Sequence, residues 1–408
     1  MLPAQTLQVL LDSIEKGCFS KNGNRLSVGD FNVKDKNISS LSGAPQKVAY
    51  DFDCSYNPDL ETLKGGPEKV GGDYNCANNP KLKSLEGAPK EMHANFWCFN
   101  NPTLVSLEGS PEEIGGDFNC SNNLNLRSLN GAPKEVHGDF WCSNNPKLDS
   151  LEGAPEIIGG DFNCSNNLIL GSLKGAPKEV HGDFWCSNNH KLASLEGAPE
   201  KIGGDFNCSN NLSLRSLKGA PKIVGRDFYW STAGVTSLDC EGITVGRDFY
   251  RSIAGVTSVT SLDCRGITVG RDFYCNDNQL ESLKGCPQTV GGDFHCYDNQ
   301  LLSLEGCPPK VGGYFSCANN HLTSLESIHM HVHEIGQTAD FKENPIKSHV
   351  LGLLKIKGLK KVFLDNKKVE EITNKYLHGA TGKDPSLRVI VDCQEELMDN
   401  DLEDYALL

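Results

Sequence analysis

The amino-acid sequence predicts a repeat solenoid, in which short coils stack on one another through parallel β-strands. The first observation is the repetition itself: VHGDFWCSNNPKLDSLEGAPEI, beginning at Val136, returns 44 residues later as VHGDFWCSNNHKLASLEGAPEK. The second is that apolar residues occupy fixed places in every copy, so that stacked copies bury a continuous core. The third is that the 42 glycines and 19 prolines among the 408 residues recur at fixed places, as turn residues do.

The copies are counted from the Val, Ile or Met that precedes the glycine pair. Copies of 22 residues begin at Val48, Val70, Met92, Ile114, Val136, Ile158, Val180 and Ile202. Copies of 21 to 24 residues follow from Val224, Val245, Val269, Val290 and Val311, and a degenerate first copy begins at Val28. We therefore expect about 14 coils between residues 28 and 333, with irregular coils at 224–268.

Each 21-residue copy follows the pattern F-x-C-x-x-N-x-L-x-x-L, shown by Phe273, Cys275, Asn278, Leu280 and Leu283. Successive side chains of a strand point to opposite faces, so Phe and Cys share the inward face. The Asp before the Phe and the residue after it then point outward. Gly-Ala-Pro and Gly-Gly supply the turns on either side of the strand.

This pattern resembles the leucine-rich repeat, in which an L-x-L-x-x-N-x-L segment forms one short parallel strand per turn. The resemblance implies that Phe and Cys take the places of inward leucines and that the Asn hydrogen-bonds the backbone of the turn. The wording SLEGAP and VGGDF-CSNN is also similar to repeats of tailed bacteriophages and related viruses. That likeness implies a viral protein in the host cytoplasm or in the virion, and it implies no biochemical activity.

Eleven of the 17 cysteines, from Cys54 to Cys317, occupy one position of the repeat. Free cysteine behaves as a small buried hydrophobe, so this column is expected to be a core stripe. Neighbouring rungs about 4.8 Å apart are within reach of a disulfide, but parallel side-by-side geometry disfavours one. Reduced thiols indicate a reducing compartment, so we expect a cytoplasmic protein.

Both ends are expected to be caps. Residues 1–27 read as an N-terminal helical cap, because Leu7, Leu10, Leu11 and Ile14 have helical spacing and no signal-peptide pattern precedes them. Residues 334–408 read as an α-rich C-terminal cap, with helices near 346–355, 369–377 and 386–405 and a strand at KKVFLD. The alternative is that this tail docks on a partner. No segment is long and apolar enough to be a membrane span.

Two columns of residues point outward from the strands. The first contains Asp51, Asp73, Asp117, Asp139, Asp161, Asp183, Asp205, Asp227, Asp248, Asp272 and Asp293, interrupted by Asn95. The second contains Asp53, Asn75, Trp97, Asn119, Trp141, Asn163, Trp185, Asn207, Tyr229, Tyr250, Tyr274 and His295. Adjacent carboxylates repel, so the first column has either a structural role, accepting backbone N–H bonds, or a role as an anionic surface.

The three tryptophans of the second column occur on every second coil, about 10 Å apart. That distance is expected to be too large for direct ring stacking, so each indole would pack between asparagine rungs. Exposed tryptophans are frequent in binding hot spots, and these would contact a protein or a carbohydrate chain. The alternation is equally explained by duplication of a two-coil unit.

In the irregular coils, Arg226, Arg247 and Arg271 precede the Asp, and the three tyrosines Tyr229, Tyr250 and Tyr274 follow the Phe. Arginine and tyrosine are both favoured at interfaces, so this is either a recognition patch or simple charge pairing with Asp. Trp230 and Arg251 replace the core Cys there, and Ala233 and Ala254 replace the turn Asn.

No chemistry-bearing motif suggests catalysis or a cofactor. His93, His137 and His181 lie two coils apart and cannot converge on one metal ion, and HMHVH at 329–333 is expected to be a surface strand. The net charge of −14 disfavours nucleic acid. We therefore expect a non-enzymatic scaffold that binds a protein partner through the outward strand face. The alternatives are a virion structural or decoration protein and a carbohydrate-binding protein.

Overall fold

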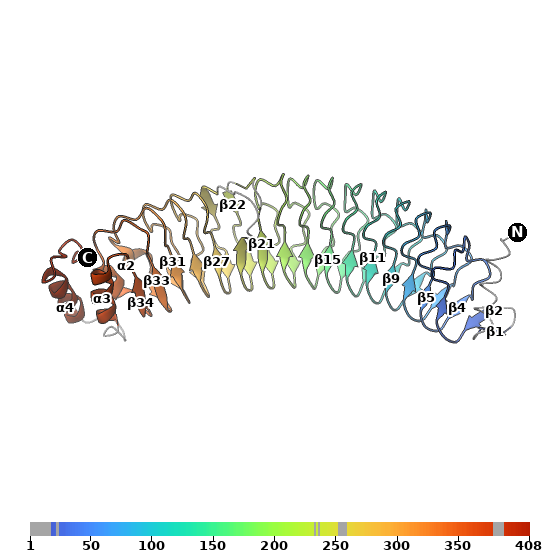
Figure 1. The fold of residues 1–408 in the computed structure, drawn as a ribbon, viewed down its shortest axis with the longest axis horizontal. Coiled ribbons are helices and arrows are strands. Elements are labelled where there is room, and N and C mark those ends of the chain that lie inside the picture. Colours follow the sequence, from blue (N-terminus) through green and yellow to red (C-terminus); the bar gives the residue numbers. More distant parts are fainter. Residues whose placement is uncertain (1–17, 22–23, 232–233, 236, 252–258, 378–386) are drawn as a thin grey trace. The chain divides into compact units, whose positions relative to one another are not determined.

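The computed structural model is a parallel β-solenoid, as the sequence predicts (Figure 1). It describes residues 18–21, 24–231, 234–235, 237–251, 259–377 and 387–408, so the expected N-terminal helix lies outside the described residues. Unit 1 comprises residues 1–214 and 219–221, and unit 2 comprises residues 215–218 and 222–408. No helix in the described ranges is long and apolar enough to cross a membrane.

In unit 1 the expected strand of each coil is present, paired in parallel with the same residues of the next coil. This stack contains β3 (Phe31–Asn32), β5 (Phe52–Asp53), β7 (Tyr74–Asn75), β9 (Phe96–Trp97), β11 (Phe118–Asn119), β13 (Phe140–Trp141), β15 (Phe162–Asn163), β17 (Phe184–Trp185) and β19 (Phe206–Asn207). We call its solvent side, formed by the Asp column and the column after the Phe, the strand face.

Each coil also has a second strand, so the expectation of one strand per turn was wrong. In unit 1 the second stack contains β2 (Asn24–Ser27), β4 (Lys47–Val48), β6 (Lys69–Val70), β8 (Glu91–Met92), β10 (Glu113–Ile114), β12 (Glu135–Val136), β14 (Ile157–Ile158), β16 (Glu179–Val180) and β18 (Lys201–Ile202). These strands have two residues each in the repeating coils, one exposed and one buried. Two residues are too few for an alternating pattern to be recognised in a sequence.

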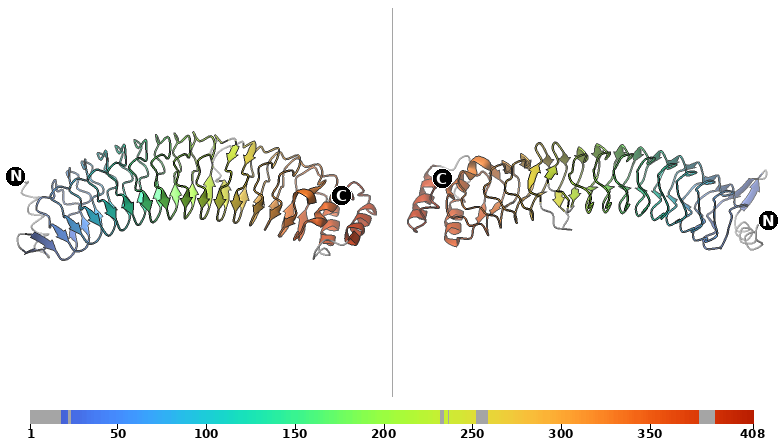
Figure 2. Two further views of the ribbon diagram at one scale, coloured as in Figure 1. Left: turned by 180° about the vertical axis from the view of Figure 1, so that it is seen from behind. Right: turned by 90° about the horizontal axis from the view of Figure 1, so that it is seen from above.

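Unit 2 likewise contains two stacks of strands, which include the irregular coils. The strand-face stack contains β21 (Phe228–Trp230), β24 (Phe249–Arg251), β27 (Phe273–Tyr274), β29 (Phe294–His295), β31 (Phe315–Ser316), β33 (Thr338–Asp340) and β34 (Lys361–Phe363). The second stack contains β20 (Ile223–Val224), β23 (Thr244–Val245), β26 (Thr268–Val269), β28 (Thr289–Val290), β30 (Lys310–Val311) and β32 (Glu334–Ile335). A further pair, β22 (Ser237–Asp239) and β25 (Ser261–Asp263), lies on the opposite side of the coils from β21 (Figures 1 and 2).

The core consists of the predicted Phe, Cys and Leu columns. In unit 1 the Phe column, with Tyr74 in one place, stacks ring on ring with centroids 4.8 to 5.9 Å apart. All eleven cysteines of the stripe are buried, and none of them is in a disulfide. Trp230 takes the place of a Cys and is fully buried, and its strand keeps the register Trp230 to Arg251. The core therefore accepts a larger side chain without a shift of strand pairing.

A buried asparagine ladder closes the turn that follows the strand. Asn145 donates from Nδ2 to the carbonyl oxygens of Cys142 and Cys120 at 2.8 and 3.2 Å. Its Oδ1 accepts the backbone N–H of Asn123 at 2.7 Å, and Asn167 repeats the arrangement one coil on. The structure thus confirms the role that the resemblance gave to this Asn. Because every polar atom of the amide is used, an apolar residue there would leave buried backbone groups unpaired.

In several coils a glycine pair lies where neighbouring coils approach closely. A Cβ on Gly159 would overlap the carbonyl oxygen of His137, and a Cβ on Gly160 would overlap Oδ1 of Asp139. Glycine at these two places therefore serves the close contact between coils and not turn conformation alone.

The described N-terminal edge is a hairpin. β1 (Cys18–Lys21) pairs antiparallel with β2, which then pairs in parallel with β4. The sequence did not predict this hairpin.

At the C-terminal end the coils continue past the expected boundary at residue 333. β32 pairs with β30, β33 pairs with β31, and β34, the predicted KKVFLD strand, pairs with β33. The HMHVH segment is not the expected strand, because α2 (Ile328–His331) forms there. Strand pairing resumes at Glu334, where β32 begins.

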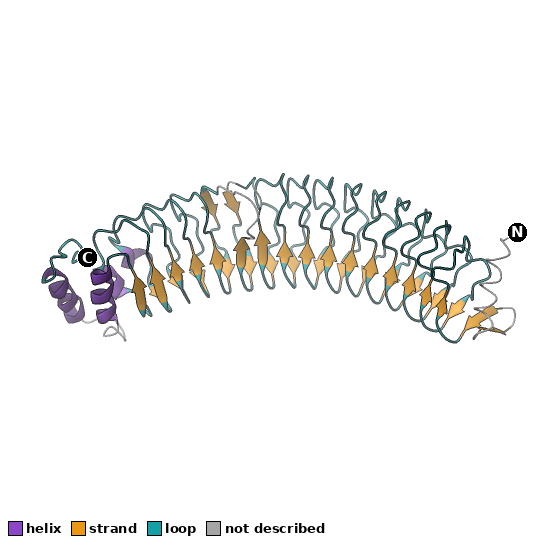
Figure 3. Ribbon diagram, viewed as in Figure 1, coloured by secondary structure: helices purple, strands orange, loops and turns teal. Residues whose placement is uncertain are grey.

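The described α-helices and the 3₁₀ helix lie at the C-terminal end of unit 2 (Figure 3). After α2 they are the 3₁₀ helix η1 (Leu351–Lys355), α3 (Lys367–Leu377) and α4 (Leu387–Met398). Asn374 of α3 accepts the N–H of Val362 at 2.8 Å and donates to its carbonyl at 2.9 Å, and Glu370 accepts the N–H of Leu364 at 2.7 Å. α3 thus pairs the edge of β34 with side chains, which protects the edge from further strand addition.

Candidate interaction surface

The Asp column of unit 1 is a chain of hydrogen bonds between coils. Oδ1 of Asp117 accepts the backbone N–H of Asp139 at 2.8 Å, and Oδ1 of Asp139 accepts that of Asp161 at 2.7 Å. The same bond joins Asp161 to the N–H of Asp183 at 2.7 Å and Asp183 to the N–H of Asp205 at 2.8 Å. The structural interpretation of this column is therefore correct. The partner-binding role of Asp139, Asp161 and Asp183 stays a proposal.

Asn95 shows that the acceptor matters more than the charge at this position. Its Oδ1 accepts the N–H of Asp117 at 2.7 Å, as a carboxylate does elsewhere in the column. Where carboxylates stand side by side, burial, with repulsion from Asp161, Asp117 and Asp183, raises the pKa of Asp139. The strand face of unit 1 is thus a half-buried anionic row held in place by its own backbone bonds.

Two of the tryptophans of unit 1 contact each other, although the coil spacing had led us to expect separate indoles. Trp97 and Trp141 stack with their ring centroids 6.0 Å apart and their planes 12° from parallel. The indoles lean toward each other across the intervening Asn119 rung, because a long planar side chain spans part of the distance between the backbones. Trp185 makes no ring contact with another described aromatic residue. The three side chains are partly buried, and part of each remains accessible to solvent.

The asparagines between the tryptophans have a local structural role. Oδ1 of Asn119 accepts the N–H of Ser121, and Oδ1 of Asn163 accepts that of Ser165, both at 2.9 Å. Asn207 makes the equivalent bond to Ser209 at 3.0 Å. In the Trp141 coil, the N–H of Ser143 is instead bound by Oγ of Ser121 at 3.2 Å. In the Trp141 coil, the serine of the preceding coil thus supplies the acceptor that an asparagine supplies in the alternate coils.

In unit 2 the same column forms a continuous aromatic row. Tyr229 meets Tyr250 edge to face at 5.7 Å, Tyr250 meets Tyr274 edge to face at 5.1 Å, and Tyr274 stacks on His295 at 4.5 Å. The structure brings together the three tyrosines that the sequence singled out. Burial, with the charges of Asp272, Asp248 and Asp293, raises the pKa of Tyr274 to about 12, so the phenol stays protonated.

The arginines of unit 2 pair with the Asp column, one coil back. Nε of Arg247 lies 3.4 Å from Oδ1 of Asp227, and Nε of Arg271 lies 3.6 Å from Oδ1 of Asp248. Arg226 is exposed on the preceding coil. Charge pairing, one of the two interpretations left open by the sequence, is thus observed for Arg247 and Arg271.

Two aromatic residues of unit 2 were not selected from the sequence. Tyr314, which stands where other coils have Asp, lies 6.1 Å from His295 and donates its hydroxyl to Oδ2 of Asp340 at 2.8 Å. Tyr297, in the turn, meets His295 edge to face at 6.0 Å. Tyr314 is the exception in the Asp column, and this exception could have identified it from the sequence as a candidate site residue.

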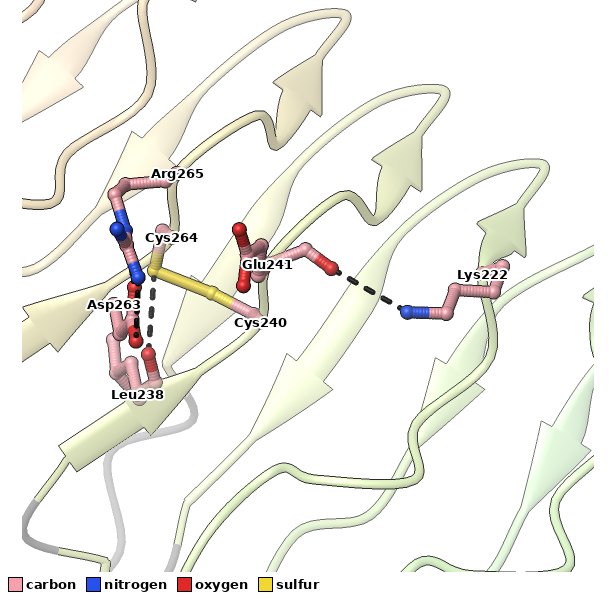
Figure 4. Close-up of a disulfide and its surroundings, with 7 residues drawn as sticks. All are labelled: Lys222, Leu238, Cys240, Glu241, Asp263, Cys264 and Arg265. Atoms are coloured by element: carbon pink, nitrogen blue, oxygen red, sulfur yellow. Dashed lines mark hydrogen bonds and ion pairs between the residues drawn. A yellow bond between two sulfur atoms is a disulfide. The ribbon is translucent and has the colours of Figure 1, made fainter.

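One cysteine pair corrects the expectation that the thiols are all reduced. Cys240 and Cys264, which follow β22 and β25, are joined by a disulfide with their Cα atoms 4.7 Å apart (Figure 4). Both lie outside the core stripe, in successive irregular coils. The Ala233 and Ala254 positions that replace the ladder Asn lie outside the described residues. The disulfide therefore joins coils in the region where the sequence lacks the ladder residue.

Within the described residues no group of three or more His, Cys, Asp or Glu side chains is arranged to hold a metal ion.

No protein-family model matches the chain, and none of the characterised proteins matches it. Among solved structures, YopM from Yersinia enterocolitica WA-314 aligns over 88% of this chain and 94% of its own, with 14% identity and a TM-score of 0.27. Likeness at this level says nothing about function.

Proposed function

We propose that the protein is a non-enzymatic scaffold that binds a protein partner through the strand face. The observation that carries this proposal is the pair of half-buried aromatic groups on that face, the Trp97–Trp141 stack in unit 1 and the Tyr229–Tyr250–Tyr274 row in unit 2. Aromatic side chains and arginine are the residues most enriched in interface hot spots. The backbone bonds of the Asp column hold the face rigid, which lowers the entropic cost of binding.

Carbohydrate binding is the weaker alternative. Sugar rings pack on the open face of an aromatic side chain, and the two stacked indoles, parallel within 12°, cover part of each other's face. A virion role would make the partner a capsid or tail protein, and co-sedimentation with purified particles tests it.

Affinity capture with matched variants tests the proposal. The strand-face variant replaces Trp97, Trp141 and Trp185 with Ala. The control replaces Leu124, Leu168 and Leu212, which are 53%, 47% and 53% exposed in the turns of the alternate coils, with Ala. Both variants lose three large apolar side chains, and circular dichroism checks that both fold.

A partner that is captured by the wild type and by the leucine variant, and is lost with the tryptophan variant, supports the strand face of unit 1. The same comparison with Tyr250→Ala and Tyr274→Ala tests unit 2. Capture of the same partner by both strand-face variants would contradict the proposal.

A further inference from the structure

The irregular coils show how a guanidinium group fits against the Asp column. In most coils the residue before the Asp is glycine, and Arg247 and Arg271 take that place in two successive coils. Each arginine reaches back to the carboxylate of the preceding coil, Arg247 to Asp227 and Arg271 to Asp248. The carboxylate accepts this cation while its Oδ1 keeps the backbone bond, at 3.0 Å in both coils.

The next two coils have the same carboxylates without the arginines. Gly292 and Gly313 stand where the next two arginines would be. Asp272 and Asp293 make the same backbone bonds, both at 2.7 Å, to the N–H groups of Asp293 and Tyr314. In the described part of unit 2 neither carboxylate has an ion-pair partner within 4.0 Å. The column of carboxylates thus continues for two coils beyond the last arginine of this series, Arg271.

Aromatic rings lie near these two carboxylates, whose charges, besides burial, raise the pKa of Tyr274 and oppose the lowering of the pKa of His295 by burial. Tyr274 and His295 stack in parallel at 4.5 Å, and Tyr314 and Tyr297 lie 6.1 and 6.0 Å from the imidazole. Burial and nearby carboxylates raise the pKa of Tyr297 and of Tyr314, whose second cause is its hydrogen bond to Asp340. Carboxylates beside aromatic faces attract a planar cation twice, by charge and by the ring quadrupole.

We propose that Asp272 and Asp293, with Tyr274, His295 and Tyr314, form a binding site for arginine side chains of the partner. The partner's guanidinium groups would take the places that Arg247 and Arg271 take in the preceding coils. This inference rests on the proposed function and adds to it the chemistry of the partner: an extended segment that carries arginine. Lysine fits less well, since its ammonium group cannot stack on a ring and bind a carboxylate side-on as guanidinium does.

The test uses a fluorescein-labelled peptide of alternating glycine and arginine with four arginines, and its lysine counterpart. Fluorescence anisotropy with the full chain measures both affinities at low salt. We expect the arginine peptide to bind more tightly than the lysine peptide. Asp272→Asn with Asp293→Asn should weaken arginine binding about tenfold, because the charges are lost. The fold is kept, since Asn95 shows that an amide supplies the backbone acceptor.

The matched control is Asp73→Asn with Asp117→Asn, which makes the same chemical change in the same column, in coils of unit 1 that lack these rings. It should leave the affinity of the arginine peptide unchanged. Tyr274→Leu, which keeps apolar bulk and removes the ring, should weaken binding about threefold.

Equal weakening by the two Asn pairs would mean attraction to the acidic chain as a whole and would overturn the inference, as would failure of the arginine peptide to bind. If the peptide fails while the capture experiment still depends on the strand face, the proposed function stands and this site is wrong. If both fail, the strand face is not the interaction surface.

Discussion

Replacing Asp139 separates two roles of a carboxylate in the Asp column, hydrogen-bond acceptor and charge. Its Oδ1 accepts the N–H of Asp161 at 2.7 Å. Asp139→Asn keeps an acceptor and removes the charge, as Asn95 does in the native chain. Asp139→Ala removes both and leaves the amide of Asp161 without its partner.

The structure sets the expected magnitudes. A hydrogen bond to a charged group contributes about 1.5–3 kcal/mol, and the partial exposure of Asp139 puts the cost of the Ala variant at the lower end, about 1–2 kcal/mol. Each neighbouring carboxylate, about 4.8 Å away, repels by about 1 kcal/mol in a water-like dielectric before salt screening. Relief of this repulsion offsets the weaker acceptor in the Asn variant, which should stay within about 0.5 kcal/mol of the wild type.

The pH dependence has a definite sign. Burial, with like-charge repulsion, raises the pKa of Asp139 above its ordinary value of 3.8. The ionised carboxylate therefore lowers the stability of the fold at pH above the folded pKa, and this cost disappears as the pH falls toward the ordinary value. The Asn variant should gain on the wild type at pH 7 and lose that advantage near pH 4.

Amide hydrogen exchange at Asp161 is the local assay, and urea unfolding followed by circular dichroism is the global one. Exchange at Asp161 should accelerate in the Ala variant and stay near wild type in the Asn variant. Equally fast exchange in both variants would refute the acceptor account and would make charge the reason for this column.

Three further outcomes are expected. Asn145→Ala should lower the free energy of unfolding by about 3 kcal/mol or more, since two carbonyls and one amide lose their hydrogen bonds. Asn144→Gly, at a position with φ of 57°, should change it by less than about 1 kcal/mol, and thermal melting measures both variants. Reduction of the Cys240–Cys264 disulfide, whose cysteines are 24 residues apart, should lower the free energy of unfolding by about 3 kcal/mol. The stability of the Cys240→Ser, Cys264→Ser variant should not change with reductant, and a wild type whose unfolding is unaffected by reductant would contradict the prediction. Burial lowers the pKa of His295 from its ordinary value of 6.5, so its contribution to stability is present above 6.5 and is lost as the pH falls through the lower pKa of the folded state. His295→Tyr, which introduces the residue of the three preceding coils, should remove this part of the acid sensitivity of urea unfolding between pH 7.5 and pH 5, and an unchanged pH difference would argue against it.

The coil repeat, the core columns and the turn asparagine were predictable because each recurs with the coil period and has one physical use. Phe140, Cys142 and Asn145 occupy places that only an apolar side chain or a carbonyl-binding amide can fill. The helix expected at 369–377 was found from its apolar spacing, and α3 confirms it within two residues. The helix expected at 386–405 is present as α4, which ends at Met398, seven residues before the expected end.

The remaining features depend on side-chain reach or on single departures from the pattern. Coil spacing fixes where the backbones of Trp97 and Trp141 lie, but the length of an indole decides whether the rings meet, and they do. The Cys240–Cys264 pair lies at a repeat position where other coils have no cysteine. The recurrence that predicted the buried cysteine stripe therefore gave no information about this pair. The aromatic cluster around His295 depends on Tyr314, which replaces the Asp of the first outward column, and on Tyr297, which lies in the turn.

The ladders of unit 1 have a consequence for how such a gene changes length. Each Asn or Asp rung bonds to the equivalent rung of its neighbour, so one rung is chemically exchangeable for another. Loss of residues 136–179 by unequal crossing-over would bring Asn123 beside Asn189 and Asp117 beside Asp183, with every acceptor meeting its usual donor. A 22-residue loss would also rejoin the ladders, but it would place two Trp coils or two Asn coils next to each other and break the alternation. Copy number in this array is therefore expected to vary most freely in steps of two coils.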